Sequence, residues 1–273
     1  MKIENNSVVR TETCSVAVAR RVAAMLGCDP TPLIEGTPLP RGWQFVLLGA
    51  DTPRSELRSD GFPGLGVPMP NLGLPRLMLG GRSVRYFKDI SVGATVRRIS
   101  SIKNLVEKST PAGPIAIVDI AHELAVNDEV AIEETQTYLL LSAQRSSSAG
   151  ASVPGDASHG EVEKVLVPDA TLLFQYSALG FNSHKIHIDR AYARDVEGFP
   201  DLVVNGGLTT LLMTEFISND VKASLVSFKT KHLAPLYCDR PIRLTAERRD
   251  DKLYVVAQDD HGVVAAKMEA EVK

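Results

Sequence analysis

Four residues that can do chemistry lie close together in the segment YSALGFNSHKIHIDRAY, residues 176–192. His184 and His187 are three residues apart, Asn182 lies five residues before His187, and Asp189 lies two residues after it. A neutral imidazole can take up and return a proton near pH 7, so the segment could form an acid–base site. The same residues could instead bind a metal ion or form a polar turn. The surrounding elements must decide among these three readings.

The metal interpretation takes His184, His187 and Asp189 as ligands. Metal sites usually add a further ligand from elsewhere in the chain, and the sequence offers no obvious one. A polar turn stays open for these side chains. However, they lie between an apolar run at 171–179, interpreted here as a strand, and a glycine-rich helix start at 203–208. Polar groups placed between buried elements often form binding or reactive sites, which favours a functional site.

Both halves of the chain show a helix together with alternating, strand-like runs. The second half predicts a helix at 207–218, followed by four strands that form a meander at 224–233, 241–249, 252–260 and 262–272. The first half predicts a helix at 15–27 and an irregular Pro- and Gly-rich stretch at 61–82. It then predicts strands within 83–89, 94–108, 114–124 and 130–143. An antiparallel sheet with one apolar face needs a covering layer, so we predict two similar α+β units packed side by side.

A Ser-, Gly- and Ala-rich stretch divides the two halves. We expect an N-terminal domain at 1–145, a linker at 146–160 and a C-terminal domain at 161–273, which carries the polar segment. The first half contains no counterpart of the Asn182/His187 pair. We therefore expect one active site per chain, unless residues from both halves build it.

The composition is that of an ordinary globular protein. Of the 273 residues 44% are apolar, and the net charge is −3 with no basic block, so we expect no nucleic-acid partner. Three cysteines without a CxxC pair, no secretory signal and no run of about 18 apolar residues predict a cytoplasmic protein without a membrane span. No GxGxxG or P-loop motif is present, and we expect neither a cofactor nor a metal.

The segment YSALGFNSHKIHIDRAYARDVEGFPDLVVNGGL, residues 176–208, resembles the signature of the MaoC-like, R-specific enoyl-CoA hydratases, which have the hotdog fold. The stretch from Gly42 to Ile102 resembles the first domain of a two-domain subgroup, which includes hydratases of itaconyl-CoA and mesaconyl-C4-CoA and 3-hydroxyacyl-thioester dehydratases. The resemblance implies a double hotdog whose N-terminal unit is degenerate. Exposed sheet edges in such units favour a homodimer or higher homo-oligomer.

Two residues depart from the family pattern. Asn182 stands where single-domain hydratases have Asp, as in the two-domain subgroup, and Asn205 stands where the family has His before Gly. The resemblance implies that His187 is the base and that the Gly206 backbone N–H stabilises the thioester oxygen at a helix N-terminus. Asn182 can hold the attacking water and orient the imidazole.

Further residues are candidates for binding an acyl-CoA thioester. His184 could contact the acyl group or face solvent, and Thr214 matches a family position near the site, although packing explains it as well. Lys229 and Lys231 could meet CoA phosphates or form a solvated strand face. Asp189 is expected to cap the segment that follows it.

The acyl chain is the least determined part of this prediction. A dicarboxylic substrate would need an arginine to bind its free carboxylate, and the first half supplies Arg76, which we prefer, and Arg82. We predict reversible hydration of itaconyl-CoA or mesaconyl-C4-CoA to citramalyl-CoA. The alternatives are a 3-hydroxyacyl-thioester dehydratase for fatty acyl chains, a non-catalytic acyl-CoA binding module and, less favoured, a thioesterase.

Overall fold

Ten strands form one antiparallel sheet in the computed structural model, which describes residues 7–111, 113–142 and 160–273. The first half contributes β1 Val8–Thr13, β2 Arg76–Tyr86, β3 Thr95–Thr110, β4 Gly113–Val126 and β5 Glu129–Leu141. The second half contributes β6 Val162–Leu166, β7 Leu225–His232, β8 Ile242–Arg249, β9 Lys252–Gln258 and β10 Val264–Val272. The α+β fold class predicted from the sequence is confirmed.

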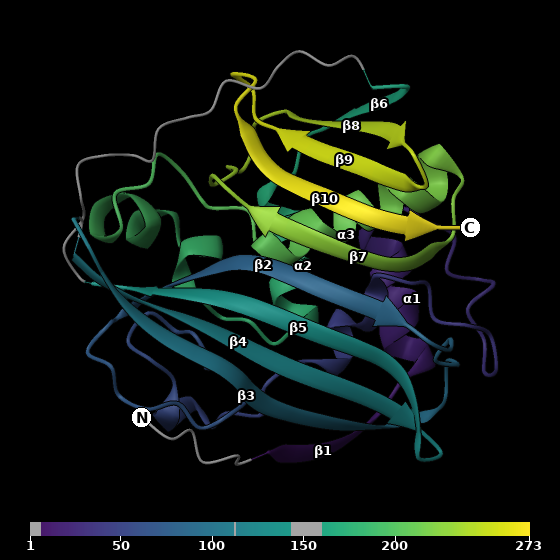
Figure 1. The fold of residues 1–273 in the computed structure, drawn as a ribbon, viewed down its shortest axis with the longest axis horizontal. Coiled ribbons are helices and arrows are strands. Elements are labelled where there is room, and N and C mark those ends of the chain that lie inside the picture. The colour runs from purple at the N-terminus through teal and green to yellow at the C-terminus, as the bar shows by residue number, and fades with distance from the viewer. Residues whose placement is uncertain (1–6, 112, 143–159) are drawn as a thin grey trace.

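The two half-sheets join edge to edge through β2 and β7. The strand order is β1-β3-β4-β5-β2-β7-β10-β9-β8-β6, so five strands from each half form one continuous sheet (Figure 1). At the joint, Arg82 lies opposite Thr230. A Cβ at Gly81 would lie 2.6 Å from the Thr230 carbonyl oxygen, so glycine permits this close approach.

The order of the last strands differs from the predicted meander. β8, β9 and β10 follow one another as hairpins, but β7 pairs with β10 rather than with β8. Alternation locates a strand, whereas its neighbour is set by long-range packing, so the local pattern missed this pairing.

The three α-helices of the described residues lie on one face of the sheet, behind the strands in the view of Figure 1. They are α1 Val16–Met25, α2 Ala170–Leu179 and α3 Gly206–Phe216. Most residues of α3 are buried, among them Leu208, Leu211, Met213 and Phe216, as expected for a helix that is apolar all round. The N-terminus of α3 therefore lies inside the molecule.

Shorter helical turns connect these elements. They are the 3-10 turns η1 Trp43–Leu47, η2 Arg54–Glu56 and η3 Lys185–His187, and the π-helical turns η4 Tyr192–Val196 and η5 Ile217–Val221. No helix in the described part of the chain is long and apolar enough to cross a membrane.

The apolar run at 171–179 is helix α2, so its interpretation as a strand is wrong. The Asp169 carboxylate accepts a hydrogen bond of 2.7 Å from the Leu172 backbone N–H and caps the helix. Leu173 and Tyr176, three residues apart, are buried on one face. A short apolar run does not distinguish a strand from a helix, and the capping residue was the signal that could have done so.

The irregular stretch predicted at 61–82 ends earlier than expected, because β2 begins at Arg76. A register irregularity between Leu79 and Gly81 hides the alternation of this strand. The predicted linker lies outside the described residues except for Gly160, and the domain boundaries drawn from it remain a prediction.

Candidate active site

A cavity of about 260 Å³ lies between the two halves of the chain. The C-terminal half lines it with the loop that carries Asn182, His184 and His187 and with the N-terminus of α3. The N-terminal half adds residues of β2 and β5 and Phe62. Residues of both halves therefore build this cavity, as the sequence left open when it assigned the arginine candidates to the first half.

His187 is held as a neutral base. Its Nδ1 lies 2.7 Å from the Val203 carbonyl oxygen, which can only accept, so Nδ1 carries the proton and Nε2 keeps its lone pair. The Val203 N–H in turn donates to Ile186 O at 2.9 Å, which fixes the loop. Burial, with a smaller contribution from His184, lowers the pKa of His187 to about 3. At neutral pH the ring is therefore uncharged, and Nε2 carries a free lone pair.

Asn182 lines the cavity beside His187. Its side-chain Oδ1 accepts a hydrogen bond of 3.1 Å from the backbone N–H of His184, and its backbone N–H donates to Ser177 O at 2.8 Å. The amide oxygen thus orders the backbone of the loop, where the sequence had suggested that it orients the imidazole. The N–H groups of the amide are what Asn182 can offer to a ligand.

Gly206 and Gly207 bring the first turn of α3 to the cavity. The side chain of the N-cap residue Asn205 makes no capping hydrogen bond to this turn. The first N–H groups of a helix have no intrahelical acceptor and carry the positive end of the helix dipole. They can stabilise a thioester oxygen as it gains negative charge.

Tyr176 explains why position 207 is glycine. A Cβ at Gly207 would lie 2.2 Å from the Tyr176 hydroxyl oxygen and 3.3 Å from Arg82 Nη2. Tyr176 is buried and stacks on Phe45 with ring centroids 4.6 Å apart. The small residue therefore lets α3 approach the polar wall of the cavity.

His184 is buried at 8% exposure and lines the cavity, so the solvent-facing interpretation is wrong. Its ring meets that of His187 edge-on, with centroids 5.5 Å apart. Its Nε2 lies 3.7 Å from Oδ2 of Asp60. Burial lowers the pKa of His184, against the opposing effect of the Asp60 carboxylate.

Arg82 presents a buried guanidinium on the cavity wall. Its Nη1 lies 3.3 Å from Glu134 Oε1, and its side chain is 8% exposed. Burial works against the charge, but Glu134 and the neighbouring tyrosines outweigh it, so the pKa of Arg82 is raised and the charge is kept. Glu134 contacts one end of the guanidinium, which has five N–H donors in all.

Arg76, the arginine preferred from the sequence, does not line the cavity. Its Nε lies 3.5 Å from Glu197 Oε2. Arg76 and Arg82 are six residues apart, so their side chains would lie on the same face of a regular strand. The register irregularity between Leu79 and Gly81 changes this alternation. The structure therefore favours Arg82 over Arg76 as the residue facing a ligand.

A second chamber of about 100 Å³ adjoins the main cavity. The two share Phe62, Arg82, Tyr138, Tyr176 and Asn182 as a common wall. The second chamber has a mixed lining, in which His122 and Gln136 are polar and residues such as Leu65 and Phe181 are apolar. Tyr138 donates a hydrogen bond of 2.6 Å to Gln136 Oε1, and Gln136 donates one of 2.7 Å to Glu134 Oε1. This network connects Arg82 with Tyr138 through Glu134 and Gln136, all within the N-terminal half.

Three residues predicted to bind substrate lie elsewhere. Thr214 is fully buried, donates to Leu211 O at 2.8 Å and packs against Gly42, which supports the packing role. Lys229 and Lys231 are exposed on β7 and do not line the cavity.

Asp189 accepts a hydrogen bond of 3.0 Å from the Tyr192 backbone N–H, so the predicted capping role is confirmed. It is absent from the cavity lining, so it is not placed to activate water for a thioesterase. No group of three or more His, Cys, Asp or Glu side chains suited to a metal was found within the described ranges.

Sequence reasoning missed Tyr176, Asp60 and His232. His232 lines the cavity at the end of β7, 3.3 Å from the Thr210 hydroxyl, and burial lowers its pKa to about 4. The alternation of β7 points Phe228, Thr230 and His232 inward, and that signal could have identified the histidine.

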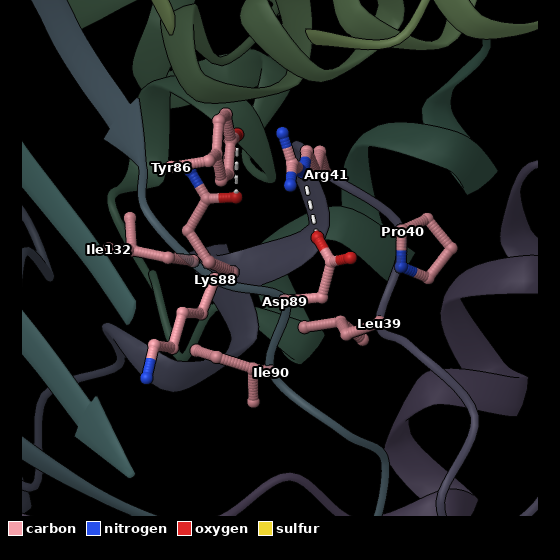
Figure 2. Close-up of a pocket in the computed structure, with 9 residues that line it drawn as sticks. Leu39, Pro40, Arg41, Tyr86, Lys88, Asp89, Ile90 and Ile132 are labelled. Atoms are coloured by element: carbon pink, nitrogen blue, oxygen red, sulfur yellow. Dashed lines mark hydrogen bonds and ion pairs between the residues drawn. The ribbon is translucent and has the colours of Figure 1, made fainter. Parts of the chain in front are cut away.

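A much smaller hollow of about 10 Å³ lies against Tyr86 and Asp89 (Figure 2). Arg41 Nε donates to Asp89 Oδ1 at 2.8 Å, and the Tyr86 hydroxyl donates to Gln44 Oε1 at 3.2 Å. Its polar groups are thus already paired, and the space is close to that of a single water molecule. The cavity that holds His187 is the candidate active site.

Comparison with known proteins agrees with this site. The family model for hydroxyacyl-thioester dehydratase type 2 matches residues 42–238. The chain is 32% identical to mesaconyl-C(4)-CoA hydratase of Chloroflexus aurantiacus, over 94% of this chain and 92% of the relative. Both names describe the addition or removal of water at an acyl thioester.

Solved structures support the fold. A MaoC-like dehydratase from Phytophthora capsici superposes with a TM-score of 0.72 at 13% identity, covering 100% of this chain and 96% of that one. A conserved Mycobacterium tuberculosis protein described as a double hotdog superposes with a TM-score of 0.63 at 14% identity, covering 99% and 96%. The chain therefore belongs to the hydroxyacyl-thioester dehydratase type 2 family of MaoC-like, double-hotdog hydro-lyases.

Proposed function

We propose that this hydratase adds water reversibly to a short C5 dicarboxylic enoyl-CoA, with mesaconyl-C4-CoA or itaconyl-CoA as substrate and citramalyl-CoA as product. The observation that carries the proposal is the buried Arg82 guanidinium on the wall of the cavity that also holds His187 and Gly206. The 32% identity to a mesaconyl-C(4)-CoA hydratase supports it.

The residues of the cavity can perform each step of hydration. As the water oxygen bonds to Cβ of mesaconyl-C4-CoA, Nε2 of His187 takes one proton, and the electron pair of the α,β double bond moves toward the thioester. The oxygen of the resulting enolate is stabilised by the N–H groups at the start of α3, where losing one such donor typically costs about 3–4 kcal/mol of barrier. The proton on His187 then passes to Cα, which restores the neutral base.

Arg82 is placed to recognise a carboxylate near the reacting carbon. In mesaconyl-C4-CoA the free carboxylate is carried on Cβ, two bonds from the thioester carbon. Arg82 Nη2 lies beside Gly207, 3.3 Å from where a Cβ would stand there. A thioester oxygen at the α3 N-terminus would therefore bring the substrate carboxylate toward this guanidinium, to which it can make charge-assisted hydrogen bonds.

A 3-hydroxyacyl-thioester dehydratase acting on fatty acyl chains is the second candidate. The family model carries that name, and the cavity also has apolar walls from residues such as Leu77 and Leu79. The non-catalytic alternative predicted that Asn182, His187 and Gly206 would not converge, but all three line one open cavity.

The test is a hydration assay with mesaconyl-C4-CoA, itaconyl-CoA, crotonyl-CoA and longer enoyl-CoA thioesters. We expect a higher kcat/KM for the dicarboxylic thioesters than for crotonyl-CoA. His187→Ala should lower kcat by roughly 10²–10⁴-fold for every substrate that the wild type hydrates.

Arginine variants separate the chemistry from the carboxylate contact. Arg82→Lys keeps a cation beside Glu134 but loses the bidentate geometry, and we expect KM for the dicarboxylic thioesters to rise about tenfold or more with little change for crotonyl-CoA. Arg76→Gln, in the same strand but outside the cavity, is the matched control. An equal loss of kcat/KM for both substrate types in Arg82→Lys, or a wild-type preference for long acyl chains, would favour the dehydratase over this proposal.

A further inference from the structure

A loop of the N-terminal half, residues 58–62, is hydrogen-bonded directly to the loop that carries His184 and His187. The Lys185 backbone N–H donates to Asp60 O at 2.8 Å, and the Ser183 hydroxyl donates to Gly61 O at 2.6 Å. Gly61 has a φ of +80°, and a Cβ there would lie 2.5 Å from Ser183 O, so glycine is required for this approach. The N-terminal half therefore sets the position of the loop that carries the catalytic histidine.

The Asp60 carboxylate is buried in this contact and held firmly. Its Oδ1 accepts a hydrogen bond of 2.9 Å from the Phe62 backbone N–H, and its Oδ2 lies 2.9 Å from Arg58 Nη2. The same Oδ2 lies 3.7 Å from Nε2 of His184. One oxygen of a fixed carboxylate is thus directed at the ring of His184.

This carboxylate favours a proton on Nε2 of His184, 3.7 Å away. A negative charge beside Nε2 favours the tautomer with the proton on that nitrogen, which leaves Nδ1 as the acceptor of the ring. His187 has the opposite tautomer, because its Nδ1 donates to Val203 O. The two rings meet edge-on in the cavity wall, and each keeps one acceptor nitrogen at neutral pH.

Hydration needs a second acceptor in this place. The attacking water has two hydrogens, and only one of them passes to His187. The amide oxygen of Asn182 already accepts one hydrogen bond, from the His184 backbone N–H, which leaves it one lone pair. The ring of His184, which lines the same cavity, can supply the acceptor for the other hydrogen.

Resting on the hydratase function proposed above, we propose that Asp60 is a positioning residue that holds His184 as its Nε2–H tautomer, and that His184 accepts the second hydrogen of the attacking water. The water oxygen bonds to Cβ, one proton goes to His187 and on to Cα, and the other hydrogen stays on the product hydroxyl. Asp60 acts only through His184 and does not touch the substrate.

The kinetic test is a double-mutant cycle of Asp60→Asn and His184→Gln, assayed by hydration of mesaconyl-C4-CoA and crotonyl-CoA. Each single variant should lower kcat about tenfold, with KM changed less than about threefold, since one hydrogen bond in the transition state is lost. The double variant should be no slower than His184→Gln alone. Asp60→Glu should recover part of the rate.

The control is Asp51→Asn, the same change at a carboxylate that is 71% exposed and pairs with Arg10. It should leave kcat and KM as in the wild type. Additive losses in the double variant would mean that Asp60 does not act through His184 and would overturn the proposal.

A measurement independent of activity is the imidazole ¹⁵N NMR spectrum, with the His184 signals assigned by their loss in His184→Gln. We expect the Nε2–H tautomer for His184 in the wild type and a mixture in Asp60→Asn, while His187 keeps Nδ1–H in both. An unchanged His184 tautomer in Asp60→Asn would overturn the positioning role. If the wild type hydrates no enoyl thioester, the hydratase proposal fails, and this spectrum alone decides the role of Asp60.

Discussion

Gly207→Ala adds one methyl group at the point where α3 meets the polar wall of the cavity. The new Cβ would lie 2.2 Å from the Tyr176 hydroxyl oxygen and 3.2 Å from Tyr176 Cζ. Carbon–oxygen contacts below about 3 Å are strongly repulsive, so the helix start and the tyrosine must separate by roughly 1 Å. Tyr176 cannot move freely, because it is buried and stacked on Phe45.

The expected losses follow from this displacement. Overpacking a well-packed interior typically costs about 1–3 kcal/mol of unfolding free energy. A shift of about 1 Å in a catalytic group can lower the rate about 10²-fold, and here the shifted groups are the N–H donors at the start of α3. We therefore expect kcat to fall far more than this modest loss of stability would explain.

The assay is enoyl-CoA hydration, with urea unfolding measured on the same samples. Gly49→Ala is the matched control, because its Cβ would meet its nearest neighbour, Phe181 Cβ, at an ordinary 3.5 Å. Adding Tyr176→Phe to Gly207→Ala removes the clashing oxygen, and the double variant should approach the rate of Tyr176→Phe alone. A Gly207→Ala enzyme with the wild-type kcat, or a double variant that is no better, would refute the reasoning.

Three further predictions concern stability and the outer face of the sheet. Burial lowers the pKa of three histidines to about 4, about 3 and about 4, namely His122, His187 and His232. Below about pH 6.5 the unfolded chain therefore binds more protons than the folded one. When the pH falls from 7.5 to 5.0, each of these histidines should lower the free energy of unfolding by ~2 kcal/mol. Equal urea midpoints at the two pH values would contradict this. Asp169→Ala removes the α2 cap and should cost about 1 kcal/mol in urea unfolding, while a change in kcat would argue against a purely structural role. Lys229→Ala and Lys231→Ala change exposed strand residues, so KM for a CoA thioester should stay within about twofold, and a larger rise would restore their predicted contact with CoA phosphates.

The sequence predicted most strands and two of the three α-helices because those signals are local. Alternation identified β7 through β10, and the glycines before residue 208 marked the start of α3. The pairing of β7 with β10 is a long-range choice that no short pattern records. Helix α2 was missed because a run of ten residues carries few periods, whereas its Asp169 cap was present in the sequence.

The site was predicted where chemistry and spacing agree within one segment. Asn182, His184, His187 and Gly206 all line the cavity, and all were candidates from the sequence. Asp60 was missed because it lies more than a hundred residues away and joins the site through loop contacts. A contact of this kind depends on the packing of two halves, which local sequence does not specify.

The choice between Arg76 and Arg82 shows how sheet geometry decides which arginine lines the cavity. Side chains alternate along a strand, so a register change of one residue turns each of them to the other face. The irregularity after Leu79 makes that change within β2, and the close approach of Gly81 to Thr230 O then fixes β2 against β7 with Arg82 opposite Thr230. Because Thr230 and the cavity-lining His232 point to the same face of β7, Arg82 is brought to the cavity between the two halves. The joint between the half-sheets therefore determines which of the two arginines lines the cavity.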